Sequence, residues 1–206
     1  MAKSFFLIHN YKTLGSTLQT FFTKDYTDRF WGQHTFDEYQ KINPHVHLNQ
    51  NAVKQYNLTH IKQHRSIDHI HINALIELNI LPKKSLPNLA FMMVVRNPID
   101  RFISTCNFTN ISPKELLNNL KNNIGDDYHQ HKLIQNRFGL KIKTIKMDNK
   151  KAITNFFKPF GIAVDLSVHK NVSLKTYTIE EHLSKDDIDF LTNFYKVDFK
   201  LFRNSI

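Results

Sequence analysis

The sequence predicts an α/β domain with a mainly parallel central sheet flanked by helices. The first observation is a continuous apolar run, Leu89–Val95, of the kind that forms a strand covered on both faces in a parallel sheet. The second is that strand-like and helical patterns alternate along the chain without a detectable internal repeat. The third is size. A chain of 206 residues with 41% hydrophobic residues can bury one sizeable core, so a single domain over residues 1–206 is expected.

Three segments have strand patterns. Residues 5–8 (FFLI) form a short apolar run before a polar loop, Leu89–Val95 is the run described above, and residues 141–147 have a strand-like composition. Helical patterns lie between them. Parallel strands need such crossover connections, which fits the predicted sheet.

The predicted helices begin at recognisable residues. Ser112 is placed as an N-cap, with Pro113 at the first helical position and Glu115 at the third, and apolar spacing continues to Ile124. Pro98 can open another helix directly after the long apolar run. Further helices are expected over residues 16–22, 70–81 and 152–157, and a last one after a cap at Ser184.

Residues 31–65 are rich in His, Asn and Gln and have weak periodicity. A long segment of this kind is expected to be a partly irregular insertion. Because it lies between the first motif described below and His71, we expect it to shape the acceptor side of a substrate site.

Charge and composition narrow the class of protein. The net charge of +10 indicates an anionic partner, but does not distinguish nucleic acid, a nucleotide, an anionic glycan or a membrane surface. The single cysteine, Cys106, cannot form an intramolecular disulfide and is expected to be a packed apolar residue in a reducing compartment. With no signal-peptide core and no apolar run of ~18 residues, the sequence predicts a cytoplasmic protein without a membrane anchor.

The first motif, KTLGST at residues 12–17, lies between the first predicted strand and the helix after it. Such a loop presents backbone N–H groups and the positive end of a helix dipole, which together hold phosphate-like anions. Lys12 adds a mobile charge, and Ser16 and Thr17 add hydroxyl donors. An ordinary ATPase is not expected, because the phosphate loop of an ATPase has its lysine directly after the last glycine, whereas here Lys12 precedes Gly15. The alternative is a surface turn with a helix cap at Ser16 or Thr17.

The second motif, VVRNPIDRFIS, spans residues 94–104. Arg96 follows the buried strand, and the helix that Pro98 opens carries Ser104 about two turns on. An arginine fork and a hydroxyl in this arrangement can share one phosphate. Asp100 and Arg101 are expected to be a structural ion pair or helix-start charges.

Together, the two motifs resemble the 5′-phosphosulfate loop and the 3′-phosphate strand and helix of sulfotransferases that use 3′-phosphoadenosine 5′-phosphosulfate (PAPS). They are most similar to the carbohydrate group related to heparan sulfate 2-O-sulfotransferase. HIH at residues 69–71, HKNVS at 169–173 and FYKVDFKLF at 194–202 follow in the order the family uses. Two positions depart from the family pattern: Tyr11 replaces the usual proline and Leu14 a small residue. No Golgi anchor like that of eukaryotic members is expected, so the resemblance implies a viral or bacterial-type enzyme.

The resemblance implies a P-loop-like domain that moves a sulfuryl group from PAPS to an acceptor hydroxyl, expected to be on a carbohydrate. It implies that Lys12 is the cation at the bridging oxygen of the leaving nucleotide, that His71 is the general base, and that His69 assists it. The implied donor-binding residues are Lys12, Thr13, Leu14, Gly15, Ser16, Thr17, Arg96, Ser104 and Ser173.

This chemistry needs no metal, and none is expected. Three histidine pairs have spacings that zinc ligands can have, but no carboxylate or cysteine set near them in sequence completes a site: His45/His47, His60/His64 and His129/His131. Nucleic acid is not an expected partner. Two alternatives stay open, a nucleotide-dependent kinase with a variant phosphate loop and a non-catalytic basic module that binds anionic glycan or nucleic acid.

Overall fold

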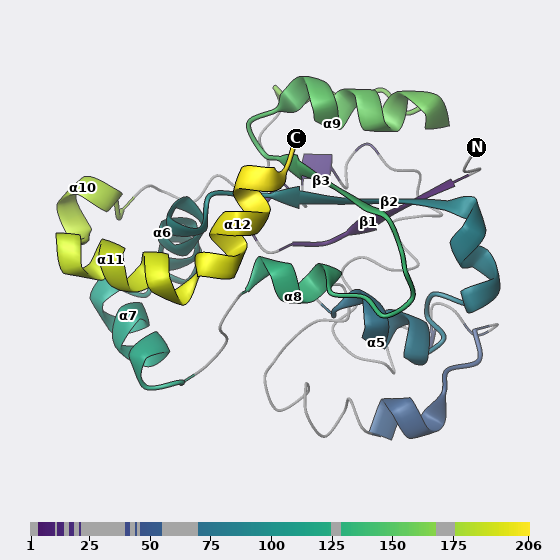
Figure 1. The fold of residues 1–206 in the computed structure, drawn as a ribbon, viewed down its shortest axis with the longest axis horizontal. Helices are drawn as coiled ribbons and strands as arrows, with labels where there is room; N and C mark the ends of the chain where they lie inside the picture. The colour runs from purple at the N-terminus through teal and green to yellow at the C-terminus, as the bar shows by residue number, and fades with distance from the viewer. Residues whose placement is uncertain are drawn as a thin grey trace.

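In the computed structural model, the centre of the molecule is a three-stranded parallel sheet in the order β1-β2-β3 (Figure 1). Its strands are β1 (Ser4–Ile8), β2 (Leu89–Val95) and β3 (Ile142–Lys146). The α/β prediction with a parallel sheet flanked by helices is therefore confirmed. The structure describes residues 4–10, 12–14, 17–18, 21, 40–41, 44, 46–54, 70–124, 129–167 and 176–206.

The middle strand, β2, is the most deeply buried. In the register of the sheet, Phe91 pairs with Phe6 on one side and with Ile142 on the other. Residues 91–95 are buried without interruption, because neighbouring strands cover both edges and helices cover both faces. The apolar run in the sequence predicted this strand with its bounds.

Helices cover the two faces of the sheet. Helix α9 (Lys150–Phe157) lies on one face, and α5 (Ile72–Glu77) and α8 (Gln130–Ile134) lie on the other (Figure 1). On the α9 face, the Phe5 ring contacts Phe156 and Phe157 edge-on, with ring centroids 6.3 and 5.2 Å apart. A short helical turn, η4 (Lys158–Phe160), follows α9, and η3 (Lys83–Asn88) leads into β2.

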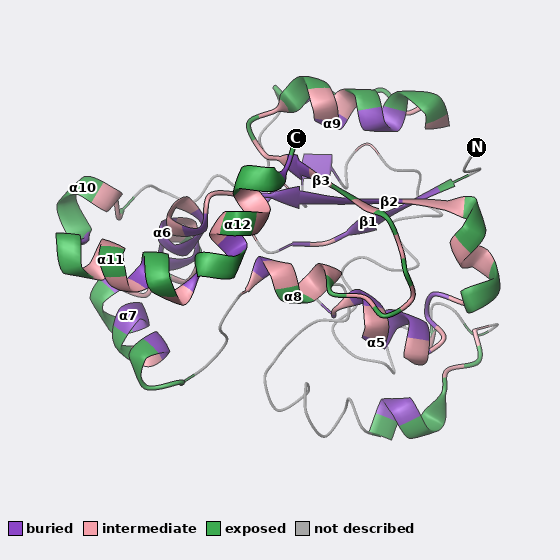
Figure 2. Ribbon diagram, in the orientation of Figure 1, coloured by how far each residue is buried: buried purple, intermediate pink, exposed green. Residues whose placement is uncertain are grey.

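A second apolar cluster lies beyond the carboxyl end of β2, among five helices (Figure 2). Phe102, Cys106, Leu117, Leu191 and Tyr195 are buried there. Burial raises the pKa of the Cys106 thiol to about 12, so this cysteine is a packed neutral group, as predicted. The helices are α6 (Pro98–Thr109), α7 (Pro113–Lys121), α10 (Ile179–His182), α11 (Lys185–Phe194) and α12 (Lys196–Asn204).

The helix starts predicted from Pro98, Ser112 and Ser184 agree with the structure. The Ser112 side chain accepts from the Glu115 N–H at 3.2 Å, and Ser184 begins α11 with a reciprocal capping box. Two predicted ends are too late. Asn79 adopts a left-handed φ of 62°, which ends α5 early, and Ile124 lies exposed beyond the end of α7.

Other parts of the chain were not predicted or are only partly described. Helix α8 and the break between α11 and α12 had no sequence prediction. Most of residues 16–22 and 31–65 lies outside the described part of the chain. Among the described residues of the second segment, residues 50–54 are helical. At the end of the chain, Ile206 exchanges backbone hydrogen bonds with Thr144 and Lys146 at the outer edge of β3. Within the described part, no helix is long and apolar enough to span a membrane.

Candidate functional site

The loop after β1 turns sharply. Lys12 and Leu14 both have left-handed φ angles, 59° and 64°, which turn the chain sharply just after the end of the strand. The Thr13 hydroxyl donates to the Asn10 carbonyl at 2.8 Å, and the Leu18 N–H donates to the Leu14 carbonyl at 2.9 Å. Thr13 and Thr17 are buried. The loop therefore keeps Lys12 near the carboxyl end of β1, while Gly15 and Ser16 lie outside the described residues.

Lys12 and Arg96, from the two predicted motifs, lie next to each other. Arg96 Nη1 donates to the Lys12 carbonyl at 3.4 Å, and Lys12 Nζ lies 3.8 Å from the centroid of the Phe108 ring. Burial and the positive charge of Arg96 both lower the pKa of Lys12. Parallel strands explain the arrangement, since the carboxyl ends of β1 and β2 meet at one edge of the sheet.

One donor of the Arg96 guanidinium lacks a partner in the described part of the chain. Its Nε is buried and has no hydrogen-bond partner among the described residues. Burial lowers the pKa of Arg96, the negative charge of Asp100 raises it, and the charge of Arg101 lowers it again. A buried donor without a partner is costly, and a phosphate oxygen is an acceptor that Arg binds well. The site is suited to an anion.

Asn10 and Gln130 hold the two strand ends together. Asn10 Nδ2 donates to the Val94 carbonyl at 3.0 Å and to Gln130 Oε1 at 2.6 Å. Gln130 Oε1 also accepts from the Arg96 N–H at 3.0 Å, and Gln130 Nε2 donates to the Arg96 carbonyl at 2.8 Å. Because both side chains are buried, these bonds fix the backbone from which the Arg96 side chain starts.

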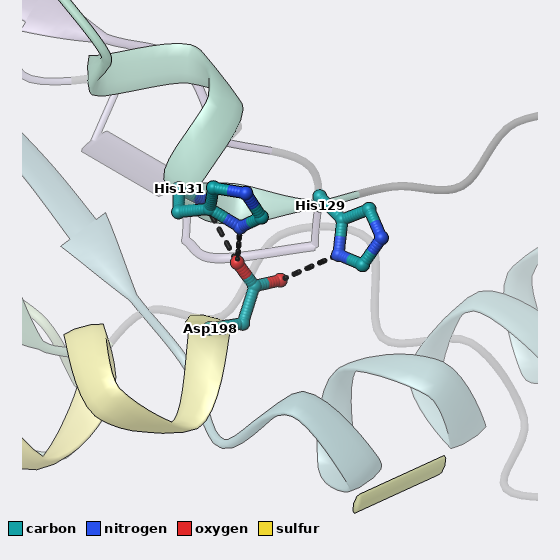
Figure 3. Close-up of side chains that lie close together, drawn as sticks. All are labelled: His129, His131 and Asp198. Atoms are coloured by element: carbon teal, nitrogen blue, oxygen red, sulfur yellow. Dashed lines mark hydrogen bonds and ion pairs between the residues drawn. The ribbon is translucent and has the colours of Figure 1, made fainter. Parts of the chain in front are cut away.

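Asp198, on α12, is the centre of a second polar cluster (Figure 3). Its Oδ1 accepts from the His131 backbone N–H at 2.8 Å and lies 2.7 Å from His131 Nδ1. Its Oδ2 accepts from the Gln130 N–H at 2.8 Å and from Arg101 Nη2 at 3.3 Å, and lies 3.7 Å from His129 Nδ1. Asp198 thereby caps the first turn of α8 from a different helix.

These contacts decide the charge of Asp198. Burial alone would raise its pKa, but the contacts with His129, the Arg101 charge and the backbone N–H groups of His131 and Gln130 lower it to about 2. The carboxylate is therefore ionised at neutral pH. Arg101 and Asp198 are a buried ion pair, at 2% and 0% exposure. Arg101 thus forms a structural ion pair with Asp198, a partner that was not predicted, and Asp100 lies in the first turn of α6, as the alternative of a helix-start charge predicted.

One ligand atom each from His129, His131 and Asp198 lie within 4.8 Å of one another, a grouping that metal sites can have. The carboxylate missing near the His129/His131 pair in sequence is thus supplied by α12. Both Asp198 oxygens, however, already accept hydrogen bonds from backbone N–H groups, and the positive Arg101 guanidinium lies beside Oδ2. A cation would have to displace these donors, so we interpret the cluster as a hydrogen-bonded ion network. His45, His60 and His64 lie outside the described residues.

The structure places His71 at the N-cap of α5, where its Nδ1 accepts from the Ala74 N–H at 3.2 Å. Ser104 is half-buried on α6, two turns after Pro98. The roles of both residues stay predictions, as does the role of Leu14. His69 and Ser173 lie outside the described residues.

Sequence reasoning missed Asn10, Gln130 and Asp198. Asn10 and Gln130 are single polar residues with ordinary neighbours, and no pattern marks them. Asp198 had a detectable signal: it falls between Tyr195 and Phe202 at helical spacing, so it lies on the same face of α12 as apolar residues. A carboxylate on an apolar face indicates a buried cationic partner.

We compared the chain with known proteins. No family model, no curated protein and no solved structure matches it.

Proposed function

We propose that this protein is a PAPS-dependent sulfotransferase with a P-loop-like fold, acting on a hydroxyl of a carbohydrate. The observation that carries the proposal is the contact between Lys12 and Arg96 at the carboxyl ends of β1 and β2. The two motifs that resemble the donor-binding motifs of sulfotransferases are 84 residues apart in sequence at these positions and meet in space. Ligands of parallel α/β sheets bind at this edge.

The two cations fit a donor with two anionic groups. Arg96, with its buried Nε lacking a described partner, suits the 3′-phosphate, and Ser104 on the following helix adds a hydroxyl. Lys12 follows the other strand and suits the 5′-phosphosulfate. The positive charges of Lys12 and Arg96 repel each other, and an anion bound between the two side chains offsets that repulsion.

Sulfuryl transfer needs in-line alignment and stabilisation of the negative charge that develops on the bridging oxygen of the leaving nucleotide. Lys12 is the residue proposed to meet that charge. A cation placed there stabilises the transition state more than the ground state, which is what raises turnover.

Transfer from radiolabelled PAPS to desulfated heparin, chondroitin and a tyrosine-containing peptide tests this proposal. We expect label on a polysaccharide with the wild type, and at least a ~100-fold lower rate with Lys12→Ala. Lys158→Ala is the matched control, because Lys158 is exposed on η4. Absence of transfer to all three acceptors, or equal rates in the two lysine variants, would contradict the proposal. Transfer of phosphate from ATP instead would favour the kinase alternative.

A further inference from the structure

We propose that His131, oriented by Asp198, accepts the proton of the acceptor hydroxyl, so that His131 is the general base and Asp198 a positioning residue. This inference rests on the sulfotransferase function proposed above. It differs from the expectation for His71, and the difference comes from the hydrogen bonds that the two imidazole rings make.

The contact with Asp198 fixes the tautomer of His131. An ionised carboxylate only accepts hydrogen bonds, so the His131 Nδ1 atom, 2.7 Å from Asp198 Oδ1, must carry the proton. In the neutral ring, Nε2 is then the unprotonated nitrogen. An imidazole held in this way by a buried carboxylate is arranged to take a proton at Nε2, and the carboxylate stabilises the imidazolium that forms.

His71 has the opposite arrangement. Its Nδ1 accepts the Ala74 N–H at 3.2 Å, so the proton of the neutral ring is on Nε2. To act as a base at Nε2, His71 would first have to change tautomer and release the cap of α5. In this conformation, Nε2 of the ring carries the proton and is not arranged to accept one.

The His131–Asp198 pair is attached to the same edge of the sheet as the proposed donor site. Gln130, the residue before His131, binds both the N–H and the carbonyl of Arg96. Arg101, the ion-pair partner of Asp198, is near enough to Arg96 for its charge to lower the Arg96 pKa. The His131 side chain is 16% exposed while Asp198 is fully buried, as a base that meets substrate and its hidden partner require.

Groups from three elements surround the His131 ring. Asp198 approaches from α12, Arg101 reaches the same carboxylate from α6, and the His129 ring lies 5.1 Å from the His131 ring. His129 in turn packs against Tyr195, with ring centroids 5.2 Å apart. Asp198 is the only described carboxylate in this cluster and already balances Arg101, so a proton gained by His131 leaves the cluster with a net charge of about +1.

In the proposed step, the acceptor oxygen forms a bond to the sulfur of PAPS while its proton moves to His131 Nε2. The bond between sulfur and the bridging oxygen breaks, and its electron pair stays on the 5′-phosphate of the leaving nucleotide. The products are the sulfate ester, adenosine 3′,5′-bisphosphate and the His131 imidazolium, which then loses its proton to solvent.

The first test needs no activity. Long-range proton–nitrogen NMR spectra distinguish the two tautomers of each histidine, and His131→Gln and His71→Gln identify the two sets of signals. We expect the wild type to show the Nδ1–H tautomer for His131 and the Nε2–H tautomer for His71. The reverse tautomer at His131 would overturn the inference even if the protein transfers sulfuryl groups.

The second test measures transfer from PAPS as a function of pH in the same two variants, with His47→Gln as control because His47 is exposed. We expect His131→Gln to bind adenosine 3′,5′-bisphosphate as the wild type does, to lose ~100-fold or more in turnover, and to lose the decline of turnover at acidic pH. His71→Gln is expected to keep that decline.

The outcomes separate this inference from the function on which it rests. An active wild type together with an active His131→Gln, or loss of the acid decline only in His71→Gln, overturns the role of His131 and leaves the sulfotransferase proposal standing. A wild type that neither binds adenosine 3′,5′-bisphosphate nor transfers label overturns the proposed function. One bound zinc per chain that is lost in His131→Gln would overturn the base assignment in favour of a metal site.

Discussion

Among the lysines that the structure describes, Lys12 stands out because burial and a second cation, Arg96, both lower its pKa. Burial and the Arg96 charge both disfavour the ammonium form. A protein gains no stability from such a pair, so the arrangement indicates a binding role more than a structural one. The ring of Phe108, 3.8 Å from Nζ, offsets part of the cost.

The pKa of Lys12 can be measured directly. We expect the NMR signal of its Cε carbon to titrate below the ordinary lysine value of 10.5, and adenosine 3′,5′-bisphosphate to raise the Lys12 pKa by supplying opposite charge. Lys12→Arg identifies the signal. A Lys12 pKa at the ordinary lysine value, unmoved by the nucleotide, would show that the ammonium lies in open solvent and holds no anion.

Three helices meet at Asp198. The residue belongs to α12, caps the first turn of α8 and pairs with Arg101 of α6, so one carboxylate ties together elements that are distant in sequence.

Pattern reasoning predicted α6 and the region of α11 well, because proline and serine mark their first turns. It could not predict α8, a helix of 5 residues whose cap comes from another element.

Replacing Asp198 should weaken the whole fold. We expect Asp198→Asn to lower the free energy of unfolding at pH 7 by ~3 kcal/mol, because it leaves the buried Arg101 charge uncompensated. Since the pKa of Asp198 falls from 3.8 to about 2 on folding, its ionised form stabilises the wild type above pH ~4. That stabilisation, about 2 kcal/mol, is lost as the pH falls toward 2.

Denaturant unfolding across this pH range measures both effects. The matched control is Asp189→Asn, an exposed position on α11 where we expect a change within ~0.5 kcal/mol. If Asp198→Asn behaves like Asp189→Asn, the ion pair does not hold these helices together.

In the molecule as a whole, the sheet and the second helical cluster each have an apolar core, and the proposed donor site lies where they meet at the carboxyl ends of β1 and β2. The sequence was sufficient to predict the sheet and several helix starts, and it singled out the two motifs whose residues Lys12 and Arg96 lie next to each other in the structure. It was insufficient for Asn10, Gln130 and Asp198, because their partners lie 34 to 120 residues away and only the folded chain brings them together.

The net charge of +10 attracts many anions, so a specific donor site must bind one of them in preference to the others. The most direct measurement is a thermal-shift titration with adenosine 3′,5′-bisphosphate, ATP and AMP on the wild type, Arg96→Ala and the control Arg203→Ala, whose arginine is exposed. At a bisphosphate concentration 100 times the Kd of the wild type, we expect the wild type and Arg203→Ala to be stabilised by about 2.7 kcal/mol. Arg96→Ala is expected to be stabilised much less, because it binds the bisphosphate more weakly. Stabilisation by ATP in preference to the bisphosphate, or an equal shift in Arg96→Ala, would contradict a donor site built on Lys12 and Arg96.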